Sequence, residues 1–276
     1  MALARHGARY RFGAPLDVRG AMGLTPLQAA AFGGQEKTAE RIAARSEWDA
    51  VSAAALGRTK ELAQVLADDP DQVHRQVGWL RATPLHAAAR GGQLEAVKLL
   101  LAEGAGKDAG ERKGETALYM AAAEGHVQVV KALLEAGFAP DVATESGSTP
   151  LHEGASKGHL DVVKALLDGG AEAGPAANRG WTPLHNALQG GHHQIVKCLL
   201  ESGANPNARL GGGFTALHQA AAWGRVRSVA SLLEAGAEIN ATDAHGRTPL
   251  ATALLNDHGE TARYLLRRGA SLRESR

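Results

Sequence analysis

The chain of 276 residues contains a single cysteine, Cys198, which excludes a stabilising network of disulfide bonds. A chain that folds without disulfides is typical of a reducing compartment. No run of apolar residues approaches the roughly 18 that a transmembrane helix needs, and the N-terminal residues lack the apolar segment of a secretory signal. These absences predict a soluble cytoplasmic protein with no membrane partner, with the nucleus as the alternative location.

Net charge is nearly absent as well, because 30 lysine and arginine residues are balanced by 29 aspartate and glutamate residues. Nucleic acids attract proteins through strong basic fields, so a formal charge of +1 argues against a nucleic-acid partner. Aromatic residues make up only 4% of the chain. Glycine is abundant instead, with 34 residues or about 12% against a usual ~7%, which predicts frequent turns and close backbone packing.

A short motif that begins with threonine recurs along the chain at a fixed spacing. It reads Thr-Pro-Leu-His or a close variant, and its copies start at Thr83, Thr116, Thr149, Thr182, Thr215 and Thr248, each 33 residues after the one before. A seventh copy starts at Thr25, outside this register. We number places in the repeat from this threonine; most copies have glycine at places −2, 9 and 21 and leucine at places 17 and 18. Such repetition predicts a repeat architecture.

Each repeat predicts two short helices followed by a projecting loop. Threonine is a good N-cap, and proline at place 1 lacks an N–H group that would have no partner there. Alanines in the middle of the first helix, such as Ala88 and Ala89, allow a neighbouring helix to pack closely. The second helix carries apolar residues at helical spacing, as in Val129, Val130 and Leu133. The glycines suit a left-handed helix end and a tight turn in the loop.

This unit resembles the ankyrin repeat, which joins two antiparallel helices to a β-turn or loop, the finger, in about 33 residues. The resemblance covers residues 13–270. A tetratricopeptide array has a similar period but lacks the Thr-Pro-Leu-His helix start. We therefore predict an all-α repeat solenoid, an ankyrin array of about eight units that is elongated, curved and monomeric, with degenerate first units.

The repeat register divides the chain into predicted units. They are an N-terminal arm (1–12), the tail of a partial repeat (13–24), a shortened repeat (25–47), a degenerate repeat (48–82), full repeats (83–115, 116–148, 149–181, 182–214 and 215–247) and a C-terminal capping repeat (248–276). In the degenerate repeat Trp48 takes the place of the threonine, only 23 residues after Thr25. The ten missing residues (33 − 23) predict a tight connection near residues 45–47 and a gap in the row of fingers.

The two ends of the chain differ from the repeats between them. The predicted arm contains Arg5, Arg9 and Arg11 and no acidic residue before Asp17, so a targeting role, mitochondrial import included, is the alternative to a loose basic end. In the last repeat the second helix carries His258, Glu260, Arg263, Arg267 and Arg268. We expect these residues to form the polar outer face that a terminal, water-facing repeat needs.

Eight of the twelve histidines occupy two fixed places in the repeat. His86, His152, His185 and His218 lie at place 3, and His126, His159, His192 and His258 lie at place 10. The resemblance implies that the first set ties the loop to the helix and that the second stabilises the turn between helices. Equivalent places in stacked repeats lie roughly 8–10 Å apart, too far to share one zinc ion at ~2.0–2.1 Å. We therefore predict no catalytic, cofactor or metal site.

The ankyrin resemblance also implies where a partner protein binds. The family uses its finger tips and the exposed side of its first helices, a concave surface that corresponds to places −4, −3, −1, 7 and 8. Three of the four tryptophans fall on these places, and tryptophan and arginine dominate interface energetics. The predicted binding residues are Trp79, Arg112, Lys113, Lys157, Arg179, Trp181, Gln189, Phe214 and Trp223. For Trp181 and Phe214 the alternative is that they cover the base of the finger.

The sequence therefore predicts a non-enzymatic scaffold that binds another protein. The first alternative is a regulatory or targeting subunit that acts through its basic N-terminal arm. The second is a surface metal site or an enzyme built around the adjacent His192 and His193, a weak motif because neighbouring side chains on a helix point in different directions. Once the repeats are subtracted, the chain has no room for a separate catalytic domain.

Overall fold

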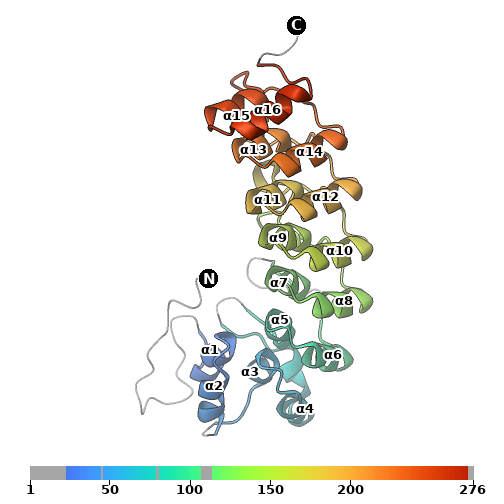
Figure 1. Cartoon of the computed structure of the whole chain (residues 1–276). Helices are drawn as coiled ribbons and strands as arrows, with labels where there is room; N and C mark the ends of the chain where they lie inside the picture. The colour runs from blue at the N-terminus through green and yellow to red at the C-terminus, as the bar shows by residue number, and fades with distance from the viewer. Residues whose placement is uncertain (1–22, 45, 79–80, 107–113, 273–276) are drawn as a thin grey trace. The chain divides into compact units, whose positions relative to one another are not determined.

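A computed structural model describes residues 23–44, 46–78, 81–106 and 114–272. Over these residues it contains sixteen α-helices and, apart from the isolated bridges Val77–Ala82 and Arg209–Thr215, no paired strands. The helices alternate between a first and a second helix of each repeat (Figure 1). The predicted all-α repeat solenoid is confirmed for this part of the chain.

The helices fall into two compact units, residues 1–139 and 140–276. In the first unit the pairs are α1 (Pro26–Phe32) with α2 (Glu36–Ala43), α3 (Ala50–Ala55) with α4 (Thr59–Asp68), α5 (Pro84–Arg90) with α6 (Leu94–Ala102) and α7 (Ala117–Glu124) with α8 (Val127–Glu135). In the second they are α9 (Pro150–Lys157) with α10 (Leu160–Asp168), α11 (Pro183–Gly190) with α12 (His193–Glu201), α13 (Ala216–Ala222) with α14 (Val226–Glu234) and α15 (Pro249–Leu255) with α16 (Gly259–Arg267). Short 3₁₀ helices occur at Pro70–His74, Asn178–Gly180 and Gly211–Gly213.

The threonine and the histidine of each motif start the first helix together. In α11 the Thr182 hydroxyl accepts the backbone N–H of His185, while the Nδ1 atom of His185 accepts the N–H of Thr182 at 3.3 Å. This reciprocal cap satisfies two N–H groups that would otherwise have no partner at a helix start. In α1, Gln28 does the same work through its side-chain oxygen, 3.0 Å from the Thr25 nitrogen.

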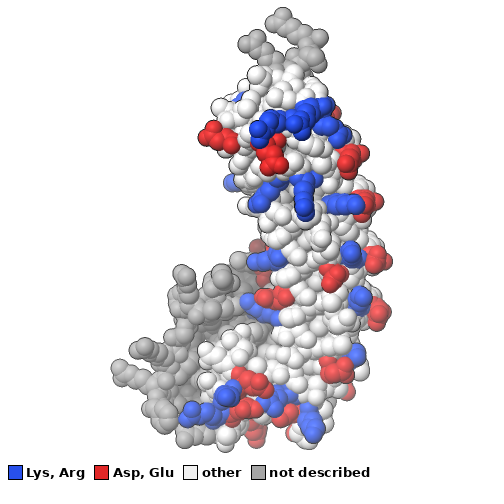
Figure 2. All heavy atoms as spheres, viewed as in Figure 1, with Lys and Arg blue, Asp and Glu red and all other residues white. Residues whose placement is uncertain are grey.

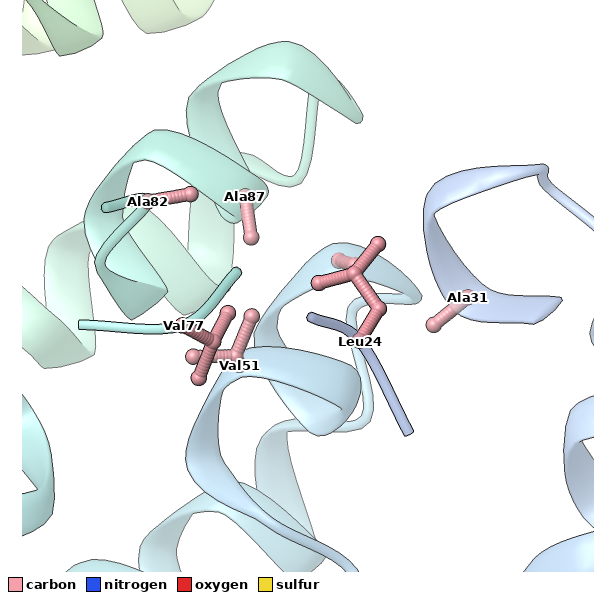
Figure 3. Close-up of a cluster of buried hydrophobic side chains, with 7 residues drawn as sticks. Leu24, Ala31, Val51, Val77, Ala82 and Ala87 are labelled. Carbon is pink, nitrogen blue, oxygen red and sulfur yellow. The ribbon is translucent and has the colours of Figure 1, made fainter. Parts of the chain in front are cut away.

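Small residues bring the first helices of the first unit close together. One buried cluster joins Leu24, Ala31, Val51, Ala55, Val77, Ala82 and Ala87 (Figure 3). The alanines present no side chain beyond Cβ, so α3 packs directly against both α1 and α5. Larger apolar residues come from both helices of a repeat, since Leu62 of α4, Leu100 of α6 and Leu118 of α7 are all completely buried. The predicted role of the alanines is therefore confirmed.

The expected short connection is found at the start of the array, where α2 ends at Ala43 and α3 begins at Ala50. Arg45 lies outside the described residues. Asp49, and not the residue at the threonine place, caps α3, because its carboxylate accepts the N–H groups of Val51 and Ser52 at 3.1 and 3.0 Å. Trp48 instead packs against the apolar cluster of α1 and α2.

The repeat that contains α15 and α16 is less polar than predicted. Leu254, Leu255, Leu266 and Leu272 are 48%, 67%, 54% and 56% exposed. The polar residues expected on this face are present, but they do not replace the apolar ones. At the same place as Leu254, Ala221 of α13 is completely buried because α15 covers it.

Candidate functional site

Four fingers of the second unit are closed by the same backbone hydrogen bond. In each, the N–H at place −5 donates to the carbonyl at place −1, over 2.9 Å from Thr144 to Ser148, 2.6 Å from Ala177 to Trp181, 2.8 Å from Leu210 to Phe214 and 3.0 Å from Asp243 to Arg247. Neighbouring fingers are also in contact. The Asn178 N–H donates to the Ser146 carbonyl at 3.0 Å, and the Ala244 N–H donates to the Gly212 carbonyl at 2.7 Å. Backbone hydrogen bonds therefore join these four fingers in two pairs, 144–148 with 177–181 and 210–214 with 243–247.

Buried histidines anchor these fingers to the first helices. The Nε2 atom of His152 donates to the carbonyl of Trp181 at 3.2 Å, and that of His218 donates to the carbonyl of Arg247 at 2.8 Å. Burial lowers the pKa of both rings, and burial lowers the pKa of His185 to about 4. These imidazoles are neutral near pH 7 and bound to backbone groups. The tie between loop and helix that the resemblance implied is confirmed for His152 and His218.

Asp243 organises the finger before α15. The residue is 7% exposed, and its carboxylate accepts the N–H groups of His245 and Arg247, both at 2.9 Å, and the Nε–H of Arg247 at 2.8 Å. Burial by itself raises the pKa of Asp243, but the hydrogen bonds from Arg247 and His245 outweigh it and bring the pKa to about 2. The carboxylate is therefore charged, and its hydrogen-bond donors, His245 and Arg247, belong to the same finger.

The histidines at place 10 join one repeat to the repeat before it. The Nε2 atoms of His126, His192 and His258 donate to the carbonyls of Arg90, Ser156 and Ala222 at 3.0, 3.2 and 2.9 Å. The accepting carbonyls lie at the C-terminal ends of the first helices of the preceding repeats, α5, α9 and α13. Their role is thus wider than the turn between two helices of their own repeat, which the resemblance had implied.

The predicted binding residues have different outcomes. Trp79, Arg112, Lys113 and the basic N-terminal arm lie outside the described residues. Lys157, Arg179 and Gln189 are exposed, and Trp223 is 38% exposed. Trp181 and Phe214 are partly buried.

Trp181 and Phe214 occupy equivalent places, and each packs against the histidine at place 3 of its own repeat. Trp181 contacts His185 edge to face, with ring centroids 6.1 Å apart, and Phe214 contacts His218 with centroids 5.3 Å apart. Each ring therefore packs against the start of the first helix, as the alternative interpretation expected of rings that cover the base of the finger. Trp223 lies at the other end of α13, eight residues or about 12 Å along the helix from Thr215.

Arg179 has a backbone conformation that the sequence did not predict. Its φ is 63°, in the left-handed region, and it is exposed at a finger tip. The equivalent residue of the next finger is Gly212, with φ 79°. A non-glycine residue in this region costs about 1–2 kcal/mol. The sequence signal for this conformation is Gly212, the glycine at the equivalent place of the next finger.

The described residues offer little for chemistry. In the ranges that the structure describes, no three side chains of histidine, cysteine, aspartate or glutamate come together to hold a metal ion. Cys198 is partly buried, and burial raises the pKa of its thiol, which is the opposite of what a nucleophile needs. Across the same ranges, no helix has both the length and the apolar character to span a bilayer.

Comparison with known families gives a match that spans nearly the whole chain. The family model described as ankyrin repeats (3 copies) matches residues 26–111, 50–144, 85–176, 137–210, 170–243 and 212–275. A search of curated proteins found no match.

Proposed function

The chain belongs to the ankyrin-repeat family, and we propose that it binds a partner protein through the fingers and first helices of its second unit. Ankyrin repeats are generally protein–protein interaction modules. We define the finger–helix face by Lys157, Arg179, Trp181, Gln189, Phe214 and Trp223. The observation that carries the proposal is the set of hydrogen-bonded fingers, which presents the exposed Arg179 and the partly buried Trp181 and Phe214 from a fixed backbone.

A fixed set of fingers favours binding because little conformational freedom is lost when a partner docks. The backbone bonds from Asn178 to Ser146 and from Ala244 to Gly212 each hold one pair of adjacent fingers in register before any partner arrives. Side chains at the tips are then presented at a repeating distance. A partner segment in an extended or helical conformation is the expected ligand for such a set of fingers.

Strain at Arg179 supports the same face. A residue keeps a left-handed conformation only when its surroundings impose it, and such positions gather at binding and catalytic sites. Glycine, as at Gly212, would fit this place without strain. The backbone conformation favours glycine at this place, so the arginine side chain itself must have a function there. We infer that this function is to bind an acidic group of the partner.

The composition of the face indicates the chemistry of the partner. Trp223 offers the largest exposed apolar side chain on it, at 38% exposure, while Lys157 and Arg179 supply positive charge. Buried tryptophans and arginines are the usual hot spots of interfaces. We expect a partner segment that is apolar near Trp223 and acidic near Lys157 and Arg179.

Affinity capture with the full chain tests the proposal and finds the partner. The bait proteins are the wild type, Trp223→Ala, Trp181→Ala and the control Lys164→Ala, which alters an exposed residue of the second helix α10. The captured partner should bind Trp223→Ala at least about 30-fold more weakly, equivalent to ~2 kcal/mol, and Lys164→Ala normally. Unchanged dissociation constants for both tryptophan variants would remove this face from the account.

A further inference from the structure

Exposed leucines gather on the α15–α16 pair and on the residues after it. Six large apolar side chains are exposed in the part of the chain that the structure describes, and four of them, Leu254, Leu255, Leu266 and Leu272, belong to this pair and the residues after it. Exposed apolar patches that are rimmed by polar residues mark interaction sites. We call these four leucines the end face.

Two leucines of the end face, Leu254 and Leu266, occupy places that are more covered elsewhere in the second unit. Leu188 occupies the place of Leu254 in the repeat of α11 and is completely buried, because α13 packs against α11. Leu200 and Leu233 occupy the place of Leu266, and both are partly buried. The end face thus has the form of a surface that accepts a helix, and among the described residues nothing covers it.

Positive charge borders these leucines. At place 19 the three preceding repeats of the unit carry Asp168, Glu201 and Glu234, whereas this repeat carries Arg267. Arg263 and Arg268 lie on the same helix or at its end, and Figure 2 shows a band of basic side chains over α16. In the region that the structure describes, no ion pair involves any of these three arginines.

The arginines also decide which occupant fits. If two copies of the chain met through this face, the like charges of Arg267 and Arg268 would be brought together from both copies, which opposes association. An acidic border on the occupant would instead pair with all three arginines. The repeat itself supplies only Asp257 and Glu260 as described carboxylates, and both are exposed.

We propose that the end face binds an amphipathic helix of a second partner protein, with leucine-like side chains on one side and acidic residues along its border. This site is separate from the finger–helix face, except that Leu255 lies at the edge of both. The apolar side chains seat the helix in the way that α13 covers Leu188. The arginines select an acidic border over a basic one.

Two synthetic helices of about 20 residues provide the probe. Both carry the same leucine stripe, one bordered by glutamates and the other by lysines, and their affinities for the full chain are measured by fluorescence anisotropy. The glutamate helix should bind at least tenfold more tightly than the lysine helix. Arg267→Glu with Arg268→Glu should reverse that order, and Leu266→Ser with Leu272→Ser should weaken both peptides at least tenfold.

These substitutions should leave the fold intact, so that a change in affinity reports on binding alone. Arg267, Leu266 and Leu272 are all exposed, and circular dichroism melting checks each protein. Trp223→Ala should bind the glutamate helix normally, which separates this site from the finger–helix face. Equal binding of the two peptides, or no effect of the leucine changes, would overturn the proposal. So would a wild-type dimer, detected by analytical ultracentrifugation, that Leu266→Ser dissociates, because a second copy would then be the occupant.

Discussion

His192 lies against Gly158 of the preceding repeat, so closely that a Cβ atom on the glycine would be 2.5 Å from the Cε1 atom of the ring. The same relationship joins His126 to Gly92 and His258 to Gly224, at 2.6 and 2.7 Å for the nearest ring atoms. The glycine and the histidine at neighbouring places of the motif therefore serve one contact between repeats.

Gly158→Ala should destabilise the second unit through this contact. The residue has φ 83°, which alone costs about 1–2 kcal/mol for alanine, and the new methyl group would also displace the His192 ring. Gly170→Ala is the matched control, because its φ is 91° but a Cβ there meets no atom within 4 Å. Thermal or urea unfolding should show a larger loss for Gly158→Ala. Equal losses would mean that the ring does not restrict this place.

Gly174→Asn should stabilise the chain by adding a missing link between repeats. At the same place, Asn207 accepts the N–H of Glu238 and Asn240 accepts the N–H of Ser271, both at 2.8 Å. The matching donor for residue 174 is the N–H of Asn205, and a Cβ at Gly174 meets no atom within 4 Å.

A net hydrogen bond contributes about 0.5–1.5 kcal/mol. Gly174→Ala is the control, since it changes the glycine without supplying an acceptor, and unfolding in urea measures both proteins. If the asparagine variant is no more stable than the alanine variant, the link has not formed.

Acid should weaken the fold in the range from about pH 6.5 to 4. His185 has a pKa of about 4 in the folded protein and near 6.5 when unfolded, so the unfolded chain binds more protons in this interval. The free energy of unfolding therefore rises with pH across it and is fully recovered above pH 6.5, with at most about 3 kcal/mol from this residue.

Urea unfolding at several pH values, compared between wild type and His185→Asn, measures this contribution. The variant should be less stable at pH 7 and should show a shallower dependence on pH. An identical slope in the two proteins would remove His185 as the cause.

Amide hydrogens of α1 and α2 should exchange faster than those of α11 and α12. Ala39 is the only buried residue of α2, whereas α12 buries Ile195, Val196 and Leu199. Repeat proteins open where the contacts between neighbours are weakest. Hydrogen exchange read by mass spectrometry resolves these segments, and uniform protection along the chain is the result that this interpretation does not allow.

Much of the fold could be predicted because each repeat carries its own signals. Thr182, Pro183 and Gly191 define where α11 begins and ends through local capping alone, and the 33-residue spacing then places the helix within the array. The shift of the α3 cap from Trp48 to Asp49 was missed, because only the helix geometry shows which of two adjacent residues reaches the free N–H groups.

The candidate site was less predictable, since it depends on side-chain directions and on neighbouring repeats. The contact of Trp181 with His185 and the left-handed conformation of Arg179 depend on how one finger rests on the next. Exposure of Leu254 was missed for a similar reason. At its place a leucine is buried in one repeat and half exposed in another, according to what packs over it.

Arg179→Gly tests the proposed finger–helix face most directly, because stability and binding should change in opposite directions. Removal of the left-handed strain should raise the melting temperature, so a weaker interaction cannot be attributed to misfolding. The account predicts a higher melting temperature together with a dissociation constant for the captured partner that is at least tenfold larger. A higher melting temperature with an unchanged dissociation constant would contradict it.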